Sequence, residues 1–519
     1  AVEMSQQLSL DAVDQYVKVN VDQFHGIEIE EWPAQIAKTA MWLMDHQMNI
    51  AISKEFGNAF VRIPLVKSAN IVHGNALQLD WTQVIAPAQC SYILGNPPFR
   101  GYSFQSPTQK QLLRRSYHEA RSAGKLDFVT AWFAKATAYM QHHPAIETAF
   151  VATNSITQGE QVSILWSALY AQGAHINFAH RTFEWRSEAS GAAAVHCVII
   201  GFALQPRSQK LLYDYEHVRA EAICREVAQI NPYLVDGPEV FLAYRREPLS
   251  ATADIMVKGS QPTDGGHFLL SFEEKQEISA NDPIAARYIR PFMGAKELIS
   301  GERRWCFWLA EAKPQDLRAS KILLQRIAAV KRTRLTSHKA KTRMDAQKPS
   351  EFQEIRQPTS EYLAIPSVSS ERRLYVPIGY LSAEVIASNL LLIIPNASRY
   401  TFGVMCSLMH NAWMRVVCGR LKSDYRYSAS IVYNNFPWPE PTNAQRQQIE
   451  KTAQAILDAR ANHPEATLAD LYDPLAMPHD LRKAHQANDR AVDAAYGKHT
   501  FTTEAQRVGF LFQRYQSLA

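Results

Sequence analysis

Long apolar runs are missing from this sequence. None approaches the roughly 20 residues that a helix needs to span a bilayer, and the first residues show no basic-then-apolar signal peptide. The six cysteines are scattered and form no Cys-x-x-Cys pair, which argues against a zinc site or a disulfide framework and fits a reducing cytoplasm. The 17 histidines are dispersed as well, so the sequence predicts no metal site.

Internal repeats and low-complexity tracts are also absent. With 46% hydrophobic and 20% charged residues, the composition is that of a globular protein. The 519 residues suffice for about three to four domains of ordinary size.

The net charge of +5 favours no particular partner, but the charges are unevenly distributed. The stretch RIAAVKRTRLTSHKAKTR (326–343) carries seven Lys or Arg and no acidic residue. Such a run repels itself unless an anion neutralises it, and the phosphates of nucleic acid are the usual anions. The alternative is a solvated surface segment. We predict phosphate contacts from four of these side chains: Arg326, Lys331, Arg332 and Arg334.

The first 205 residues show strands that alternate with helices, which indicates a mostly parallel, doubly wound α/β sheet over about residues 20–205. We expect an opening strand that ends at Glu28, then strands at Asn70–His73, Tyr92–Leu94, Thr148–Ala152, Ile176–Phe178 and Val195–Phe202, helices at Asp127–Gln141 and Gln161–Ala171, and a loop at Arg181–Gly191. Residues 206–438 are irregular, with short segments between Pro and Gly turns, and residues 439–519 open with a helix at Gln445–Arg460. The expected domains are therefore 1–205, 206–438 and 439–519.

The stretch SYILGNPPFRGY (91–102) ends a strand in an unusual way. Proline cannot continue a central strand, so the strand ends here and displays Asn96 and Phe99 at its carboxyl end, the edge where open α/β sheets bind ligands. The amine of an aromatic base is a poor nucleophile, and two acceptors about 3 Å from the nitrogen would activate it by taking its two N–H bonds. The Asn96 side-chain oxygen and the Pro97 carbonyl are candidates, with Pro98 stiffening the loop and Phe99 stacking on the base.

Two earlier strands also end in polar groups. Glu28, with Ile29 beside it, follows the first strand, where an acid can bind both hydroxyls of a ribose; the alternative is a solvated acid at a helix start. Asn75 follows the second strand and could accept from an adenine amine, with Ala76 and Leu77 lining the pocket. A plain turn residue is an equally good interpretation of Asn75.

The order GIEIE, GNALQLDW, GNPPF resembles the class I, S-adenosylmethionine-dependent amino-methyltransferases that act on adenine in DNA. Three longer blocks, FHGIEIEEWPAQIAKTAMWLMDHQMN, IPSVSSERRLYVPIGY and GRLKSDYRYSASIVYNNFPWP, are similar to the MmeI-like single-chain restriction-modification enzymes. The resemblance spans essentially the whole chain. It implies a Rossmann-like methyltransferase sheet, then a mixed α+β target-recognition domain and a helical C-terminal segment. It also implies that Asn96, Pro97 and Phe99 engage a flipped adenine and that Glu28 and Asn75 hold S-adenosylmethionine, with double-stranded DNA as partner.

One feature departs from that family. Its members carry an acidic, glycine-rich loop before the GIEIE strand, whereas residues 1–20 contain no glycine. The family's N-terminal nuclease and helical spacer have no counterpart either. We therefore expect a methyltransferase sheet that lacks its first strand and its cofactor loop, in a chain that looks like the downstream part of a longer protein.

Chemistry on a base within a duplex requires the base to be extruded and held in a pocket. Phe183 or Trp185, in the expected loop 181–191, could form the second wall of an aromatic sandwich; partly buried loop aromatics are the alternative. If residues 421–427 are extended, Lys422 and Asp424 point the same way and could read one G·C pair, with Arg426 close by on the DNA. The alternative is a surface salt bridge between Lys422 and Asp424.

Three other functions compete with an adenine-specific DNA methyltransferase. A cytosine-N4 methyltransferase would usually carry Ser or Thr in place of Asn96. A protein-glutamine methyltransferase would not need some 300 further residues with a basic run. A catalytically silent DNA-binding remnant would explain the missing cofactor loop.

Overall fold

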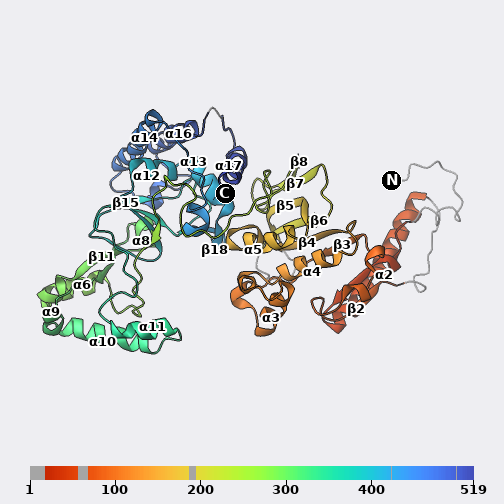
Figure 1. The fold of residues 1–519 in the computed structure, drawn as a ribbon, viewed down its shortest axis with the longest axis horizontal. Helices are drawn as coiled ribbons and strands as arrows, with labels where there is room; N and C mark the ends of the chain where they lie inside the picture. Colours follow the sequence, from red (N-terminus) through yellow and green to blue (C-terminus); the bar gives the residue numbers. More distant parts are fainter. Residues whose placement is uncertain (1–17, 57–67, 186–194, 422, 498–499) are drawn as a thin grey trace. The chain divides into compact units, whose positions relative to one another are not determined.

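The computed structural model describes residues 18–56, 68–185, 195–421, 423–497 and 500–519 (Figure 1). The chain divides into two compact units. Unit 1 comprises Ala1–Ile156 and Ile164–Val227, and unit 2 comprises Thr157–Ser163 and Ala228–Ala519.

Unit 1 contains two separate sheets. In the first, strands β1 (His25–Glu28) and β2 (Asn70–His73) pair in parallel, with Glu28 opposite His73. The second has the strand order β3-β4-β6-β5-β7-β8, built from β3 (Tyr92–Gly95), β4 (Glu147–Thr153), β6 (Val195–Ala203), β5 (His175–Trp185), β7 (Lys210–Asp214) and β8 (Ile223–Val227). The helices of this part of the chain are α2 (Glu31–Phe56), α3 (Pro107–Ser116), α4 (Thr130–Met140) and α5 (Gly159–Tyr170).

The α/β class is confirmed, and four strands of the six-stranded sheet, β3, β4, β5 and β7, run in the same direction, but β6 and β8 run antiparallel to them. Strand pairs β3/β4 and β5/β7 are parallel, whereas β4/β6, β5/β6 and β7/β8 are antiparallel. Parallel neighbours need a crossover of a dozen or more residues, and the connection between Trp185 and Val195 is shorter than that. Strands β5 and β6 therefore pair as antiparallel neighbours.

The expectation of a loop at Arg181–Gly191 is wrong for residues 181–185. Strand β5 continues to Trp185, and Phe183 lies opposite Cys197 of β6 after a register shift between His180 and Phe183. The alternating side chains of RTFEW can pack on both faces of a sheet, so this stretch extends the ladder. Residues 186–191 lie outside the described residues.

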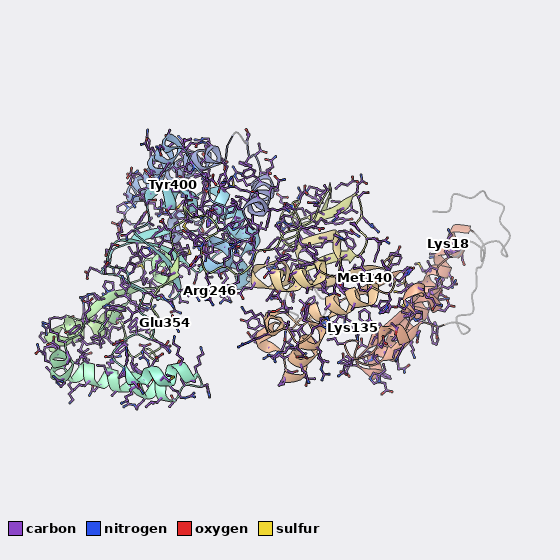
Figure 2. All side chains as sticks on the ribbon, in the orientation of Figure 1. Lys18, Lys135, Met140, Arg246, Glu354 and Tyr400 are labelled. Carbon is purple, nitrogen blue, oxygen red and sulfur yellow. The ribbon has the colours of Figure 1, made fainter. Side chains whose placement is uncertain are left out.

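Aromatic side chains form the core of the six-stranded sheet. Phe133 of α4 stacks on Phe202 of β6, with ring centroids 5.2 Å apart and an interplanar angle of 12°. Phe150 of β4 meets Phe133 edge-on at 5.2 Å, and Trp166 of α5 lies 6.3 Å from the same ring. All four side chains are buried. Figure 2 labels two further residues of helix α4, Lys135 and Met140, which mark the course of this helix. This packing fixes the strands whose carboxyl ends carry the candidate site.

Unit 2 begins with short strands in three small sheets, which confirms a mixed middle region. Their orders are β10-β12-β11-β16, β15-β13-β17-β9 and β14-β19-β18. The strands are β9 (Val257–Lys258), β10 (Leu269–Leu270), β11 (Ile289–Met293), β12 (Trp305–Phe307), β13 (Tyr362–Pro366), β14 (Val368–Ser369), β15 (Gly379–Leu381), β16 (Ile386–Ala387), β17 (Leu391–Pro395), β18 (Gly419–Leu421) and β19 (Asp424–Arg426).

Helices surround these sheets and form the C-terminal part of the unit. They are α6 (Phe272–Asn281), α7 (Pro283–Ala286), α8 (Ala295–Ser300), α9 (Pro314–Ala319), α10 (Lys321–Leu335), α11 (Ala340–Met344), α12 (Arg399–Met405), α13 (Leu408–Val417), α14 (Asn443–Ala461), α15 (Leu468–Leu471), α16 (His479–Ala495) and α17 (Glu504–Leu518). Helix α14 confirms the helix expected at Gln445–Arg460. None of the helices in the described part of the chain combines the length and apolarity needed to cross a membrane.

A buried carboxylate ties the C-terminal helices to the preceding chain. Asp489 of α16 accepts hydrogen bonds from the Tyr375 hydroxyl at 2.7 Å and from the main-chain N–H of Leu408 at 2.6 Å. Burial raises the pKa of Asp489 to about 6. The stability of this part of the unit should therefore depend on pH.

Candidate active site and DNA interface

The loop that follows β3 presents its polar group to solvent. Strand β3 ends at Gly95, and the next residues are exposed Asn96, buried Pro97, exposed Pro98 and half-buried Phe99. A Cβ on Gly95 would lie 3.3 Å from the ring of Phe150, so glycine allows the close approach of β3 to its neighbour β4. The loop thus keeps the carboxamide and the aromatic ring accessible, as the predicted chemistry requires.

Hydrogen bonds fix the exit of this loop. The Arg100 carbonyl accepts from the main-chain N–H of Phe128 at 2.9 Å and from the Gln105 side-chain amide at 3.2 Å. The same Gln105 amide donates to the Leu126 carbonyl at 2.9 Å. Because both ends of the loop are anchored, Asn96 and Phe99 are held in a defined position relative to β4 and α4.

A carboxylate that sequence reasoning missed lies beneath this edge of the sheet. Asp127 is only 5% exposed, and its Oδ2 accepts from the Thr153 hydroxyl at 2.8 Å and the Ser155 hydroxyl at 2.5 Å. Thr153 ends β4, the strand next to β3, and Ser155 follows it. The available signal was an acid before the apolar helix VTAWF, together with a hydroxyl-rich loop after the next strand; neither alone predicts that they meet.

The tips of β1 and β2 lie side by side, because the two strands pair in parallel with Glu28 opposite His73. The Glu28 carbonyl accepts from the Gly74 N–H at 2.7 Å, and the half-buried Glu28 carboxylate accepts from the Glu30 N–H at 3.2 Å. Ile29, beside it, is 58% exposed. The carboxylate retains accessible oxygens at the carboxyl end of a parallel strand.

The Asn75 side chain closes a turn. Its Oδ1 accepts from the Leu77 N–H at 2.9 Å, which is the geometry of an Asx turn. The Ala76 carbonyl accepts from the Trp81 indole at 2.9 Å. All three residues of this turn, Asn75, Ala76 and Leu77, are half-buried, so the turn forms a preformed wall. One lone pair of the Asn75 side-chain oxygen already accepts a main-chain hydrogen bond.

The segment after this turn packs on α4. The Lys135 ammonium donates to the Leu79 carbonyl, and the Tyr139 hydroxyl donates to the Ile85 carbonyl at 2.7 Å. Burial lowers the pKa of Lys135, and nearby Asp80 partly offsets the effect. Helix α4 thereby contacts both the chain that follows β2 and the core of the six-stranded sheet.

The two candidate stacking residues differ in availability. The Phe183 ring stacks on Tyr215 at 5.5 Å with an interplanar angle of 26°, so one of its faces is covered. Trp185, at the end of β5, is 41% exposed and lies 6.1 Å from Phe183. Between the two, Trp185 has the more accessible ring.

The condition under which Lys422 and Asp424 would share one strand face, an extended stretch over residues 421–427, is not met. Strands β18 and β19 form a tight antiparallel hairpin in which Leu421 lies opposite Asp424, so the chain reverses between them. Lys422 lies outside the described residues. Asp424 is half-buried and Arg426 exposed. Asp424 therefore belongs to a strand that runs back along β18, not to an extended stretch over residues 421–427.

The β18–β19 hairpin is held by contacts within it and by a close approach of α5. The Arg420 guanidinium lies 4.1 Å from the centre of the Tyr425 ring and donates to the Ser423 carbonyl at 2.7 Å. A Cβ added to Gly159, the first residue of α5, would lie 3.2 Å from the Cα of Gly419, so two glycines let the backbones touch. Gly159 also has φ of +59°, which favours glycine.

The basic run folds into α10 and α11, and the predicted phosphate role of Arg334 is wrong. Arg334 is 1% exposed, and all its N–H groups point at main-chain carbonyls. The acceptors are Thr263, Asp345, Lys348, Pro262 and Glu351, at 2.6–3.1 Å. An arginine whose N–H groups all donate to main-chain carbonyls has no donor left for DNA.

The other three basic side chains differ in exposure and in ion pairing. Arg326 is half-buried and donates to Glu274 at 2.6 Å and to the His267 carbonyl at 3.2 Å, so its charge is already paired. Lys331 and Arg332 are exposed on α10. Over the described residues, no group of three or more His, Cys, Asp or Glu is placed to hold a metal ion.

Three family models match the chain in succession. The DNA-methyltransferase domain of MmeI matches residues 1–214, the MmeI target recognition domain matches residues 236–440, and the MmeI C-terminal domain matches residues 441–519. Together they define the class: a DNA-methyltransferase domain that is followed in the same chain by a target recognition domain and a helical C-terminal domain.

Two individual proteins are similar over nearly the whole chain. The structure of the Type IIL restriction-modification enzyme MmeI in complex with DNA matches with a TM-score of 0.86 and 50% identity, over 97% of this chain and 67% of that one. "DNA methyltransferase A" of Bacillus subtilis (strain 168) is 38% identical over 506 residues, which is 96% of this chain and 56% of the relative. The chain belongs to the MmeI family. It spans only about half the length of this curated relative.

Proposed function

We propose that this protein transfers a methyl group from S-adenosylmethionine to the N6 amine of a flipped adenine at a specific DNA sequence, within a restriction-modification system. The observation that carries the proposal is the anchored loop after β3, with exposed Asn96, buried Pro97 and half-buried Phe99 at the carboxyl end of a parallel strand pair. Family membership supports the methyltransferase class. The choice of adenine as the target base and of N6 as the methylated atom rests on the chemistry of the loop.

The loop is suited to an exocyclic amine as the methyl acceptor rather than to a ring carbon. The Asn96 side-chain oxygen and the Pro97 carbonyl accept the two N–H bonds of the adenine amine, so that the nitrogen lone pair turns out of the ring and becomes nucleophilic. Phe99 stacks on the base and fixes its plane. The nitrogen loses its proton to water after the new N–C bond forms, so no carboxylate base is required. Asn96 also disfavours the competing cytosine-N4 chemistry.

The residues at the tips of β1 and β2 fit the adenosine half of the cofactor. Glu28 has acceptor oxygens at a strand end for two ribose hydroxyls, and the turn of Asn75, Ala76 and Leu77 supplies a half-buried wall for the base. Ile29 adds an exposed apolar side chain. S-adenosylmethionine, when bound, would supply an electrophilic methyl group and leave as S-adenosylhomocysteine, with the electron pair of the broken S–C bond on sulfur.

We assign base stacking opposite Phe99 to Trp185, with Phe183 behind it, since Phe183 is itself covered by Tyr215. Sequence readout is assigned to the β18–β19 hairpin with Lys422, Asp424 and Arg426, and phosphate contacts to Lys331 and Arg332. The corresponding domains are residues 1–205 for methyl transfer, 206–438 for target recognition and 439–519 for the helical end.

A direct assay tests the proposal. The purified chain is incubated with unmethylated genomic DNA and methyl-labelled S-adenosylmethionine, and the DNA is digested to nucleosides. Label in N6-methyladenine supports the proposal; label in N4-methylcytosine, or labelled protein with unlabelled DNA, contradicts it. Asn96→Ala is the control for contaminating activity.

One observation favours a second candidate, a catalytically silent DNA-binding protein. In the described residues, β1 and β2 form their own sheet, and no strand pairs it with the sheet that carries Asn96. A cofactor site divided between two unjoined sheets is poorly preorganised. Calorimetry separates the candidates: no heat of S-adenosylmethionine binding, alongside intact duplex binding, favours the silent protein.

A further inference from the structure

The end of strand β5 that carries the two candidate stacking residues has lost one of its neighbouring strands. In the described part of the chain, β5 pairs with β7 only as far as His180, which lies opposite Tyr213. On its other side β5 stays paired with β6 up to Trp185, which lies opposite Val195. A strand end with one neighbour opens more readily than a strand between two neighbours, so the aim of Trp185 depends on some other support.

A β-bulge turns Phe183 onto the face of the sheet that carries His180. Their partners on β6, Cys197 and Ile199, are two positions apart, whereas Phe183 and His180 are three apart. In a regular strand, a spacing of three would place the two rings on opposite faces. Here their centroids lie 6.4 Å apart, and the Trp185 ring follows at 6.1 Å from Phe183. Bulges often re-aim side chains in this way beside active sites.

The segment that follows β7 braces this end of β5. The Tyr215 hydroxyl lies 2.8 Å from His180 Nδ1, and the Tyr215 ring stacks on Phe183 at 5.5 Å. Burial lowers the pKa of His180, so the imidazole is neutral and Nδ1 can accept from the hydroxyl. Further along the segment, the Val218 carbonyl accepts from the main-chain N–H of Glu184 at 2.7 Å. Tyr215 therefore contacts β5 on both sides of the bulge, at His180 before it and at Phe183 after it.

We propose that Tyr215, held by His180, is a positioning residue for the flipped adenine: it fixes Phe183 and thereby sets the angle at which the Trp185 ring meets the base. This inference rests on the proposed function, because it takes Trp185 as the wall opposite Phe99. Trp185 is 41% exposed, so it is the ring of this group that is open to a base. A base stacks well only on a ring whose plane is held in place by its own neighbours.

Removing the hydroxyl alone should therefore weaken the capture of the base. The flipped adenine competes with the paired adenine of the duplex, so a less well held wall shifts that equilibrium back towards the pair. Tyr215→Phe keeps the stacked ring and loses one hydrogen bond, which corresponds to about threefold to tenfold in an equilibrium constant. We expect base flipping and kcat to fall by that factor. Duplex affinity should not change, because phosphate contacts dominate it.

The experiment uses a duplex with the sequence that the wild type methylates in the genomic DNA of the assay above. Permanganate oxidation of the thymine opposite the target adenine measures flipping, because an unpaired thymine reacts faster. Tyr213→Phe is the matched control: it removes a hydroxyl that is hydrogen-bonded with Cys224 of β8 rather than with β5. It should leave both oxidation and kcat unchanged. His180→Phe should reproduce the loss of Tyr215→Phe, and the double variant should lose no more than either alone, since both remove the same bond.

A second substrate distinguishes positioning from damage to the fold. In a duplex whose target adenine lies opposite an abasic site, no base pair competes with the pocket. The kcat of Tyr215→Phe should return to within about twofold of the wild-type value on this duplex. An equal loss of kcat on both duplexes would indicate a structural defect and overturn the inference.

Trp185→Ala separates the inference from the function on which it rests. If the wild type methylates no adenine, or if binding does not raise thymine oxidation, the proposed function fails and the inference fails with it. If Trp185→Ala leaves oxidation unchanged, the wall assignment and the inference are wrong while methyl transfer stands. If Trp185→Ala lowers oxidation but Tyr215→Phe behaves like Tyr213→Phe, the inference alone is wrong.

Discussion

Replacing Arg334 by methionine should destabilise the α10 region without changing DNA contacts. The guanidinium donates to five carbonyls from three segments, around residues 262–263, 345–348 and 351. Hydrogen bonds from a charged group contribute about 1.5–3 kcal/mol each but are far from additive, and breaking a buried charged network costs about 3–5 kcal/mol. We therefore expect a loss of about 3–5 kcal/mol, which corresponds to an increase of about a hundredfold or more in local opening.

Hydrogen exchange at residues 262–264 and 345–351 measures this opening directly, and DNA affinity at several salt concentrations measures phosphate contacts. Arg332→Met is the matched control, because Arg332 is exposed on the same helix. It should leave exchange unchanged and flatten the salt dependence. The reasoning is refuted if Arg334→Met costs less than about 1 kcal/mol while it flattens the salt dependence as Arg332→Met does.

Three further predictions address other parts of the molecule. Lys331→Ala with Arg332→Ala should weaken binding to all DNA sequences alike and reduce the salt slope by about 1–2; a loss confined to one sequence would contradict a phosphate role. Because the folded-state pKa of Asp489 is raised to about 6, the native state binds an extra proton between about pH 4 and pH 6, so stability should fall by about 3 kcal/mol as pH rises through that window. Melting temperatures of wild type and Asp489→Asn across pH 4–7 check this, and parallel profiles would contradict it. Asp127→Asn should lower kcat for methyl transfer about ten- to a hundredfold with DNA affinity intact, since it disturbs only the support beneath the loop; an equal loss of affinity would indicate damage to the fold instead.

Local sequence patterns predicted the individual elements of unit 1 well. The strands at Asn70–His73 and Tyr92–Leu94 and the helix of α4 occur as expected. Proline and side-chain periodicity act over a few residues, so they can be read without knowing the fold. The pairing of strands depends on which distant segments meet. For that reason the antiparallel β5–β6 ladder was not foreseen.

The same distinction holds for the candidate site. The position of Asn96 could be predicted from the proline-terminated strand. The hydrogen bonds of Asp127 with Thr153 and Ser155 could not, because they depend on how the fold places β4 beside this part of the chain. Arg334 looked like its neighbours in the basic run, because nothing local reveals that five distant carbonyls surround it. Alternation alone does not distinguish one extended stretch over residues 421–427 from a hairpin in which Leu421 lies opposite Asp424.

The most direct test of the central claim, that Asn96 activates the amine of an adenine, is long-read sequencing of DNA from a methylation-free host that expresses the chain. Wild type and the control Thr108→Ala, an exposed residue of α3, should leave N6-methyladenine at one position of a recurring sequence. Asn96→Ala should erase this mark. Methylation that survives Asn96→Ala, or a mark on cytosine, would contradict the claim.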